Sequence, residues 1–334
     1  MPTVQTVTGV MDAANMGFTL PHEHIFWDLS LYLPEHPDPT PICPEIYGEL
    51  KYHLWDYSDN VVQQDPALAV RELRWFKEAG GGTICDNSCH GLSADPVMIR
   101  RVSEETGVPV ILGTGCYFAQ LLPAELQEMD EDRLAELYVR ELTEGVGDTG
   151  VKCGFIGEIG VLTADWEHTR RFLAAAAMAQ KQTGAAITIH QPGTEQRAED
   201  IFKVLTDHGA DLQKVIMCHC DPYLPDHDYL DNMAKAGANL SFDFFGLEAV
   251  LAGVLWLPTD KDRILAAAEQ IARGNLNKIV FSHDTANKSM LRTYGGFGYA
   301  HLQKHLLPLM EGLGVTKEQQ KIITEDNPQR IFGR

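Results

Sequence analysis

Residues 166–190, WEHTRRFLAAAAMAQKQTGAAITIH, contain the structural unit from which the fold can be predicted. Apolar residues recur at helical spacing from about Trp166 to Gln182, and Gly184 follows as a helix stop. The next residues, AAITIH, form a short apolar run that is typical of a buried strand and ends at His190. Repeated along a chain, this order of helix, glycine and buried strand predicts a parallel α/β sheet.

The same unit recurs along almost the whole chain. Asp65-Pro66 and Asp95-Pro96 each resemble an N-cap with proline at the first helical position, and a glycine and an apolar strand follow each helix. Further helices are predicted around 132–144 and from a cap at Thr194. Eight strands, each followed by a helix, predict a TIM (β/α)8 barrel. They are expected to end near His24, Asp86, Thr114, Glu158, His190, His219, Asp243 and Asp284.

The length of 334 residues suits one such barrel, which needs about 250 residues plus insertions. No linker or change in composition divides the chain, so residues 1–334 are expected to form a single domain. Residues 28–64, after the first strand, are rich in proline and aromatic residues and too long for a simple connection. We expect a loop insertion that serves as a lid or binding surface, with a packed surface excursion or an oligomer contact as the alternative.

Composition restricts the classes of partner. With 44% hydrophobic and 22% charged residues and no run of about 20 apolar residues, the chain is expected to be globular and not to span a membrane. A net charge of −20 opposes nucleic-acid binding, so we expect a small-molecule substrate. The seven cysteines lack C-x-x-C spacing, and residues 1–17 show no secretory signal. We therefore expect a cytoplasmic protein with free thiols. The sequence does not decide its oligomeric state, for which a homodimer is one candidate.

Six potential metal ligands follow apolar runs at the predicted carboxyl ends of the strands, where TIM-barrel active sites lie. Each alone is usually a cap or a hydrogen-bonded surface group, but all six in one layer indicate a metal site. Imidazole and carboxylate ligands suit Zn²⁺, which we expect, or Mn²⁺, Fe²⁺ or Co²⁺. Six ligands exceed the needs of one catalytic ion, so we expect two divalent ions that share a carboxylate. The six are His22, His24, Glu158, His190, His219 and Asp284.

This ligand order resembles the amidohydrolase superfamily, and within it the phosphotriesterase-like family. The likeness extends over TLPHEH, GTGCY, CHCD, GGFGYAHL and DNPQRIF, and is closest to the phosphotriesterase homology proteins. The resemblance implies a binuclear site in which His22, His24 and Asp284 hold one ion. His190 and His219 would hold the other, and a residue of the fourth strand would bridge the two.

The chain departs from better-known family members at three places. GFIGEIG offers Glu158 where many members carry a carboxylated lysine, and Lys152 precedes the strand and is expected at the opposite end of the barrel. Phe244 follows Asp243 where the phosphotriesterases have a histidine, so a proton relay through that residue is not expected. After the second strand, GLSAD lacks the arginine of the common Gly-Arg-Asp.

The expected chemistry is hydrolysis by a water that two metal ions activate, with Asp284 accepting its proton. By resemblance to lactonases of the family, Tyr117 would lie over the metals and stabilise the developing oxyanion; otherwise it is a rim aromatic. Lys288, Arg292 and Tyr294 form a cationic cluster that is expected to bind a substrate carboxylate or phosphate. The alternative for this cluster is pairing with surface acids or a subunit contact.

We therefore expect a hydrolase of a carboxylic ester or lactone, with a small anionic or sugar-derived lactone as substrate. The alternative is a phosphotriesterase. A TatD-like nuclease also combines an HxH pair with a fourth-strand glutamate, but the net charge of −20 disfavours it. A non-catalytic small-molecule binding barrel is disfavoured because all six ligands are present.

Overall fold

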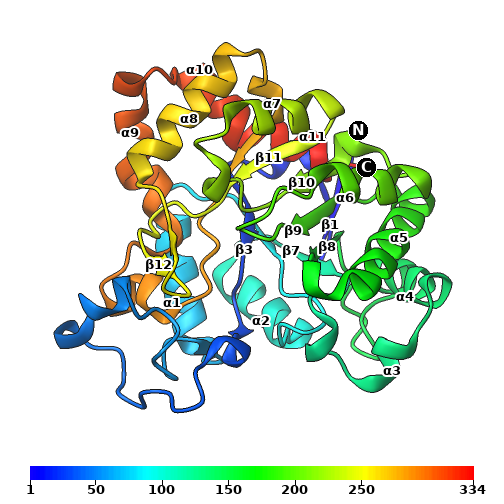
Figure 1. Ribbon diagram of the computed structural model, residues 1–334, viewed down its shortest axis with the longest axis horizontal. Coiled ribbons are helices and arrows are strands. Elements are labelled where there is room, and N and C mark those ends of the chain that lie inside the picture. The colour runs from blue at the N-terminus through cyan, green and yellow to red at the C-terminus, as the bar shows by residue number, and fades with distance from the viewer.

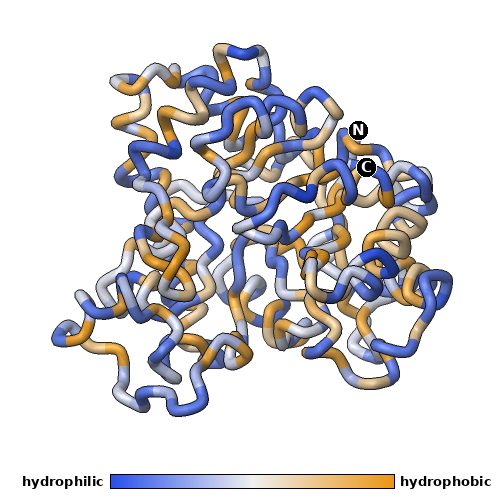
Figure 2. Tube along the Cα trace, in the orientation of Figure 1, coloured by the Kyte–Doolittle hydropathy of each residue, from blue (hydrophilic) through white to orange (hydrophobic).

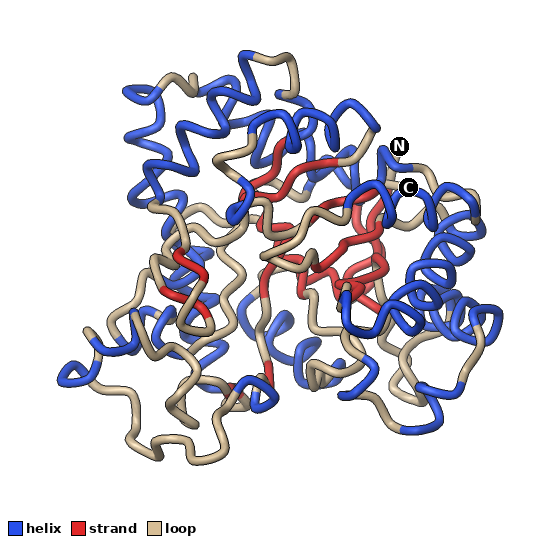
Figure 3. Tube along the Cα trace, viewed as in Figure 1, coloured by secondary structure: helices blue, strands red, loops and turns tan.

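The structure, a computed structural model, describes residues 1–334 and contains one sheet of eight parallel strands. Helices surround this sheet (Figures 1 and 3). Its strands lie in the order β14-β11-β10-β9-β8-β7-β6-β3. The edge strands meet, because the backbone N–H of Asp284 donates to the carbonyl of His22 over 3.2 Å. The predicted TIM barrel is thus confirmed. The strands are β3 (Thr19–Glu23), β6 (Thr83–Asp86), β7 (Val110–Thr114), β8 (Phe155–Gly160), β9 (Ile187–His190), β10 (Val215–Met217), β11 (Asn239–Phe242) and β14 (Ile279–Phe281).

The helices begin and end largely where caps and glycines predict. Asp65 and Asp95 accept hydrogen bonds from the backbones of Ala67 and Met98, and Gly184 ends α5 in the left-handed region at φ +69°. The helices between the strands are α1 (Pro66–Glu78), α2 (Pro96–Thr106), α3 (Ala124–Glu128), α4 (Glu131–Thr143), α5 (Trp166–Thr183), α6 (Ala198–Asp207), α7 (His227–Ala236) and α8 (Asp260–Ala272).

The predicted cap at Thr194 is wrong, because α6 begins four residues later and Arg197, which precedes it, makes no side-chain cap. The hydroxyl of Tyr223 donates to the carbonyls of Pro192 and Glu195 and holds this stretch as a turn. The loop after β9 therefore continues to Arg197 before the helix starts, and Gly193 and Thr194 in it line the cavity described below.

The two termini close the opposite end of the barrel. A hairpin of β1 (Thr3–Thr6) and β2 (Gly9–Asp12) pairs with the chain end, since the backbones of Thr3 and Arg334 exchange hydrogen bonds of 2.9 and 3.0 Å. The last helical segments include α9 (Leu307–Met310), α10 (Lys317–Lys321) and α11 (Asn327–Phe332). Thr316 and Gln319 form a capping box at the start of α10. None of the helices is both long and apolar enough to cross a bilayer.

Residues 28–64 form the predicted insertion after the first barrel strand. Its base is closed by the pair β4 (Trp27–Asp28) and β5 (Val62–Gln63), and only short 3-10 turns lie between them. The insertion, blue at the lower left of Figure 1, packs against the loop after β14, where Lys288 N donates to the Asn60 carbonyl over 2.9 Å. A second excursion is the hairpin of β12 (Val250–Leu251) and β13 (Leu255–Trp256).

Side-chain alternation along the strands separates the helix-facing core from the barrel interior. Along β9, Ile187 and Ile189 belong to a core cluster of 73 buried residues shared with the helices, whereas Ala186 lies in an interior cluster of 12. Apolar stretches accordingly follow the central strands in Figure 2. The interior position of His190 at the end of this strand then faces the open end of the barrel.

Candidate metal centre

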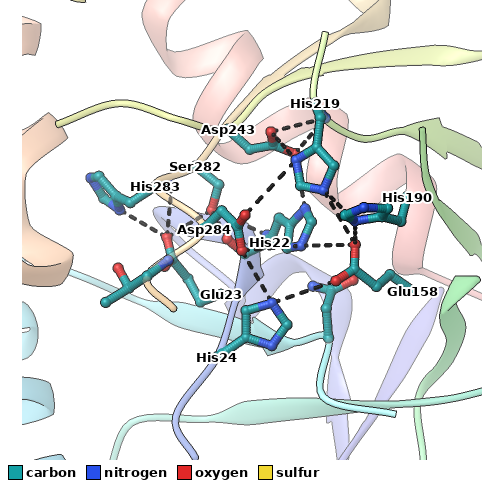
Figure 4. A network of polar contacts seen from close by, with 12 residues as sticks. His22, Glu23, His24, Glu158, His190, His219, Asp243, Ser282, His283 and Asp284 are labelled. Atoms are coloured by element: carbon teal, nitrogen blue, oxygen red, sulfur yellow. Dashed lines mark hydrogen bonds and ion pairs between the residues drawn. The ribbon is translucent and has the colours of Figure 1, made fainter. Parts of the chain in front are cut away.

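The structure brings the six predicted ligands together at the carboxyl ends of five strands, or just beyond them (Figure 4). Ligand atoms of His22, His24 and Glu158 lie within 4.8 Å of one another, as do those of Glu158, His190 and His219. Asp284 joins His22 and His219 in a third such group. The sites expected for two ions are therefore adjacent and share residues.

Glu158 is the residue common to both halves of the cluster. Its Oε2 lies 3.4 Å from His22 Nε2, 3.1 Å from His190 Nδ1 and 3.4 Å from His219 Nε2. Its other oxygen, Oε1, lies 3.6 Å from His24 Nε2. A carboxylate that lies among four histidines, with one oxygen near three of them and the other near the fourth, has the placement that a bridging ligand requires.

Asp243 orients one histidine in each half of the cluster. Its two oxygens accept hydrogen bonds from Nδ1 of His22 at 2.9 Å and Nδ1 of His219 at 3.0 Å. It also accepts from the backbone N–H of His219. Because Nδ1 is engaged in both rings, Nε2 of each is the nitrogen directed into the cluster, as metal-binding histidines require. Ser88 Oγ, 2.9 Å from Nδ1 of His24, plays the same part for that ring.

Glu23 holds the turn that carries Asp284. This fully buried carboxylate accepts hydrogen bonds from the backbone N–H groups of His283 and Thr285, on either side of Asp284, each at 2.9 Å. Ser282 Oγ and His283 Nδ1 donate to it as well, both at 2.8 Å. Asp284 itself has φ +50°, a left-handed conformation that is strained for a residue with a side chain. The four hydrogen bonds compensate for that strain and fix the direction of the Asp284 carboxylate.

Electrostatics favour positive charge in this cluster. Burial opposes ionisation of Glu158, yet the charges of His22 and His190 outweigh it and hold the pKa of Glu158 well below its usual range. Burial also disfavours the charged form of His219, but the carboxylate of Asp243 raises its pKa well above the ordinary value. The carboxylates thus remain ionised and attract cations, whether protons or metal ions.

One unpartnered nitrogen in the cluster indicates that these residues fit a pair of divalent ions. His22 Nε2 is buried without a hydrogen-bond partner, although it lies among three other imidazoles and two carboxylates. Such an orphaned nitrogen is costly unless a cation or donor satisfies it. Histidine and carboxylate donors match the preference of Zn²⁺ and related divalent ions. His22, His24 and Asp284 would hold one ion, His190 and His219 the second, and Glu158 would bridge.

A cavity of about 230 Å³ lies over the cluster. Tyr117 lies on its wall, with the hydroxyl 3.2 Å from Nε2 of His190 and hydrogen-bonded to the hydroxyl of Tyr32 over 2.9 Å. Tyr32 in turn stacks on Trp55, at 4.4 Å between ring centroids. Both belong to the 28–64 insertion, which therefore forms part of the cavity wall.

The predicted cationic cluster lies outside this cavity. Lys288 Nζ pairs with Asp59 of the insertion over 2.6 Å, and the Arg292 guanidinium lies 4.3 Å above the ring of Trp75. Tyr294 is half-buried beside them and does not line the cavity either. Lys288 therefore pairs with an acidic residue, which was the alternative to substrate binding for this cluster. It does so because the loop after β14 turns away from the barrel mouth and packs on the insertion.

Several residues of the site were not singled out from the sequence. Asp243 follows the seventh strand at the same level as the six ligands, so its position was a usable signal for a partner of the histidines. Ser88 lies two residues beyond the strand end at Asp86 and gave no such signal. Tyr32 and Trp55 belong to an insertion whose packing no periodicity predicts.

The fold and the site define a class: a (β/α)8 barrel with a candidate binuclear metal centre at the carboxyl ends of its strands. The model of the phosphotriesterase family matches residues 2–332, so the chain belongs to that family. A relative named N-acetyltaurine hydrolase, from Tetraodon nigroviridis, is 32% identical over 338 residues, covering 98% of this chain and 96% of the relative. The chain is thus similar to hydrolases over its whole length.

Solved structures agree with this assignment. A resiniferatoxin-binding protein from Rhodobacter sphaeroides matches with TM-score 0.96 and 34% identity, over 99% of this chain and 95% of that one. The phosphotriesterase homology protein from Escherichia coli, complexed with phosphate in its active site, matches with TM-score 0.78 and 25% identity, over 95% and 99%. The resemblance to the homology proteins is therefore confirmed.

Proposed function

We propose that this protein is a binuclear metal-dependent hydrolase that cleaves a carboxylic ester or lactone. The observation that carries the proposal is the position of Glu158, whose carboxylate lies 3.1–3.6 Å from all four candidate histidine ligands, His22, His24, His190 and His219. This bridging position lies directly below a cavity large enough for a small substrate.

Two divalent ions at this centre would supply a nucleophile at neutral pH, by lowering the pKa of a bound water, and would polarise the substrate carbonyl. The chain's own residues do the rest. Asp284 lies on the turn that Glu23 holds by hydrogen bonds to the backbone N–H groups on either side. It would accept the proton of the attacking water and return it to the leaving group. Tyr117 would donate its hydroxyl proton to the oxyanion while accepting a hydrogen bond from the Tyr32 hydroxyl, 2.9 Å away.

Amide hydrolysis is a second candidate, since relatives such as the N-acetyltaurine hydrolase are named for it. The named substrate contains a sulfonate, whereas the cavity lining includes neither lysine nor arginine. A sulfonated amide is therefore disfavoured here. An amide without that charge would require Asp284 to protonate a nitrogen leaving group, a harder step than release of an alkoxide.

The test is a substrate panel applied to protein loaded with Zn²⁺, Mn²⁺ or Co²⁺. It compares γ- and δ-lactones, 4-nitrophenyl esters, N-acetyl amides, a phosphotriester and single-stranded DNA, with and without chelator. We expect turnover of lactones or carboxylic esters, abolished by the chelator. Faster cleavage of the amide, the phosphotriester or DNA would replace the proposal with that activity. A metal-loaded protein that turns over nothing would indicate a binding barrel.

A further inference from the structure

The walls of the cavity differ in character from its floor. The floor consists of the candidate metal ligands, whereas thirteen of the 23 lining residues are hydrophobic, and none is a lysine or arginine. The hydrophobic residues come from three places: the 28–64 insertion, the ends of the barrel strands, and the β12–β13 hairpin with Leu251 and Leu255. A charged substituent on the substrate would find no counter-charge on these walls and would lose its hydration there.

The β12–β13 hairpin closes one side of this apolar space. A Cβ added to Gly193, in the loop after β9, would lie 3.1 Å from Leu255 Cδ2, so the hairpin packs directly on that loop. Its turn has φ +49° at Ala252 and +69° at Gly253, which matches the twist of a tight hairpin. The side chains of Leu251 and Leu255 are only half-buried, so they retain apolar surface that a ligand can cover.

Unpartnered polar atoms among the lining residues indicate what a ligand must offer. Asn287 Nδ2 and Trp55 Nε1 are buried hydrogen-bond donors without acceptors, and Gln191 Oε1 is a buried acceptor without a donor. Asn287 and Gln191 are more than nine-tenths buried. Buried polar atoms of folded proteins are normally paired, so three unpartnered atoms on residues that line one cavity leave hydrogen bonds that a ligand can make. All three are neutral, and neutral donors suit a carbonyl or ether oxygen.

We propose that the cavity selects an uncharged substrate, with an apolar body against the β12–β13 hairpin and the 28–64 insertion. A neutral oxygen of this substrate accepts hydrogen bonds from Trp55 and Asn287. The bond that is cleaved in this substrate rests on the proposed function. The class of molecule that the cavity binds does not depend on that function. It replaces the small anionic lactone expected from the sequence, since the residues expected to bind the anion lie outside the cavity.

The kinetic test uses Zn²⁺-loaded protein and a series of 4-nitrophenyl esters: acetate, butyrate and hexanoate, with the anionic hemisuccinate as the charged counterpart of the butyrate. We expect kcat/KM to rise about fourfold per added methylene until the cavity is filled. We expect the hemisuccinate to lie at least about tenfold below the butyrate. A wild-type protein that prefers the hemisuccinate overturns the proposal.

Two variants locate the preference in the cavity. Leu255→Arg places a cation on the hairpin and should lower kcat/KM for the butyrate while raising it for the hemisuccinate; Leu309→Arg, exposed on α9, is the control. Trp55→Phe removes one N–H donor and should raise KM about threefold to tenfold. Trp166→Phe, on α5 outside the cavity, is its control. An unchanged ratio of the two substrates in folded Leu255→Arg, or an unchanged KM in Trp55→Phe, contradicts the assignment.

A binding measurement separates this proposal from the proposed hydrolysis. Neutral alkyl ketones of the same chain lengths cannot be hydrolysed, and their binding is measured by calorimetry with a carboxylate-bearing ketone as the charged counterpart. If no ester is turned over but neutral ketones bind and Leu255→Arg weakens them, the hydrolysis fails and the substrate class holds. If esters are hydrolysed without preference for neutral or apolar groups, the hydrolysis holds and the substrate class fails.

Discussion

Replacement of Asp243 by asparagine tests whether this residue prepares both halves of the metal centre. The carboxylate accepts hydrogen bonds from Nδ1 of His22 and Nδ1 of His219, at 2.9 and 3.0 Å. An asparagine has the same shape but one acceptor oxygen, so its NH₂ group would face an Nδ1–H. One of the two rings must then lose its partner, and its preference for presenting Nε2 to the metal weakens.

The expected magnitude follows from the loss of one such partner. Removing an outer partner of a metal-binding histidine typically reduces metal affinity by about 10- to 100-fold, which corresponds to about 1.4–2.8 kcal/mol. Because Asp243 contacts a histidine assigned to each ion, the loss is expected at one or both sites. The fold should survive, since the substitution keeps the volume of the buried side chain.

The assay is metal competition against a chelator of known affinity, with thermal unfolding of the chelated protein as a check on folding. Asp231→Asn is the matched control, because Asp231 is also buried and hydrogen-bonded, on α7 away from the centre. A folded Asp243→Asn protein with metal affinity within twofold of wild type would refute the proposed role.

Three further predictions concern other residues of the site and its surroundings. Glu158→Ala should lower metal content and activity together, because it removes the bridge; two retained ions per chain with normal turnover would show that the site is misassigned. Glu23→Gln should lower kcat by about tenfold or more with KM little changed, since the turn carrying Asp284 loses one of its acceptors. A change confined to KM would argue against the role of Glu23 in holding Asp284. For His90, burial lowers the pKa, but the hydrogen bond from Nε2 to Glu141 outweighs it and the pKa is raised. The stability that this pair contributes is therefore fully present below the unfolded pKa of about 6.5 and is lost as pH rises through the folded pKa. The free energy of unfolding in urea should differ most between wild type and His90→Gln in acid, and the two values should converge at higher pH. A difference that grows with pH would contradict the predicted pH dependence.

The sequence predicted the fold well because each repeated unit has local signals. Asp65 and Asp95 cap helices that begin at the next proline, and Gly184 ends α5 as its lack of a Cβ allows. Thr194 shows the limit of such signals. A threonine before a polar stretch is a plausible cap, but the tertiary hydrogen bonds of Tyr223 hold that stretch as a turn.

The candidate site was predictable to the extent that strand ends place side chains. The six ligands needed only the count of eight strands, since the carboxyl ends of parallel strands meet at one end of a barrel. The substrate contacts depend on long loops, which lack periodicity. Lys288 lies four residues after Asp284 in sequence, but its ion pair with Asp59 depends on how the 28–64 insertion packs, and no local pattern encodes that contact.

If Glu158 bridges two metal ions, an ion should lie on each side of its carboxylate. Anomalous diffraction from crystals of the zinc-loaded protein, recorded above and below the zinc absorption edge, tests it most directly. We predict two peaks, one among His22, His24 and Asp284 and one between His190 and His219, with a carboxylate oxygen of Glu158 bound to each. A single peak, or two peaks without Glu158 between them, would contradict the account.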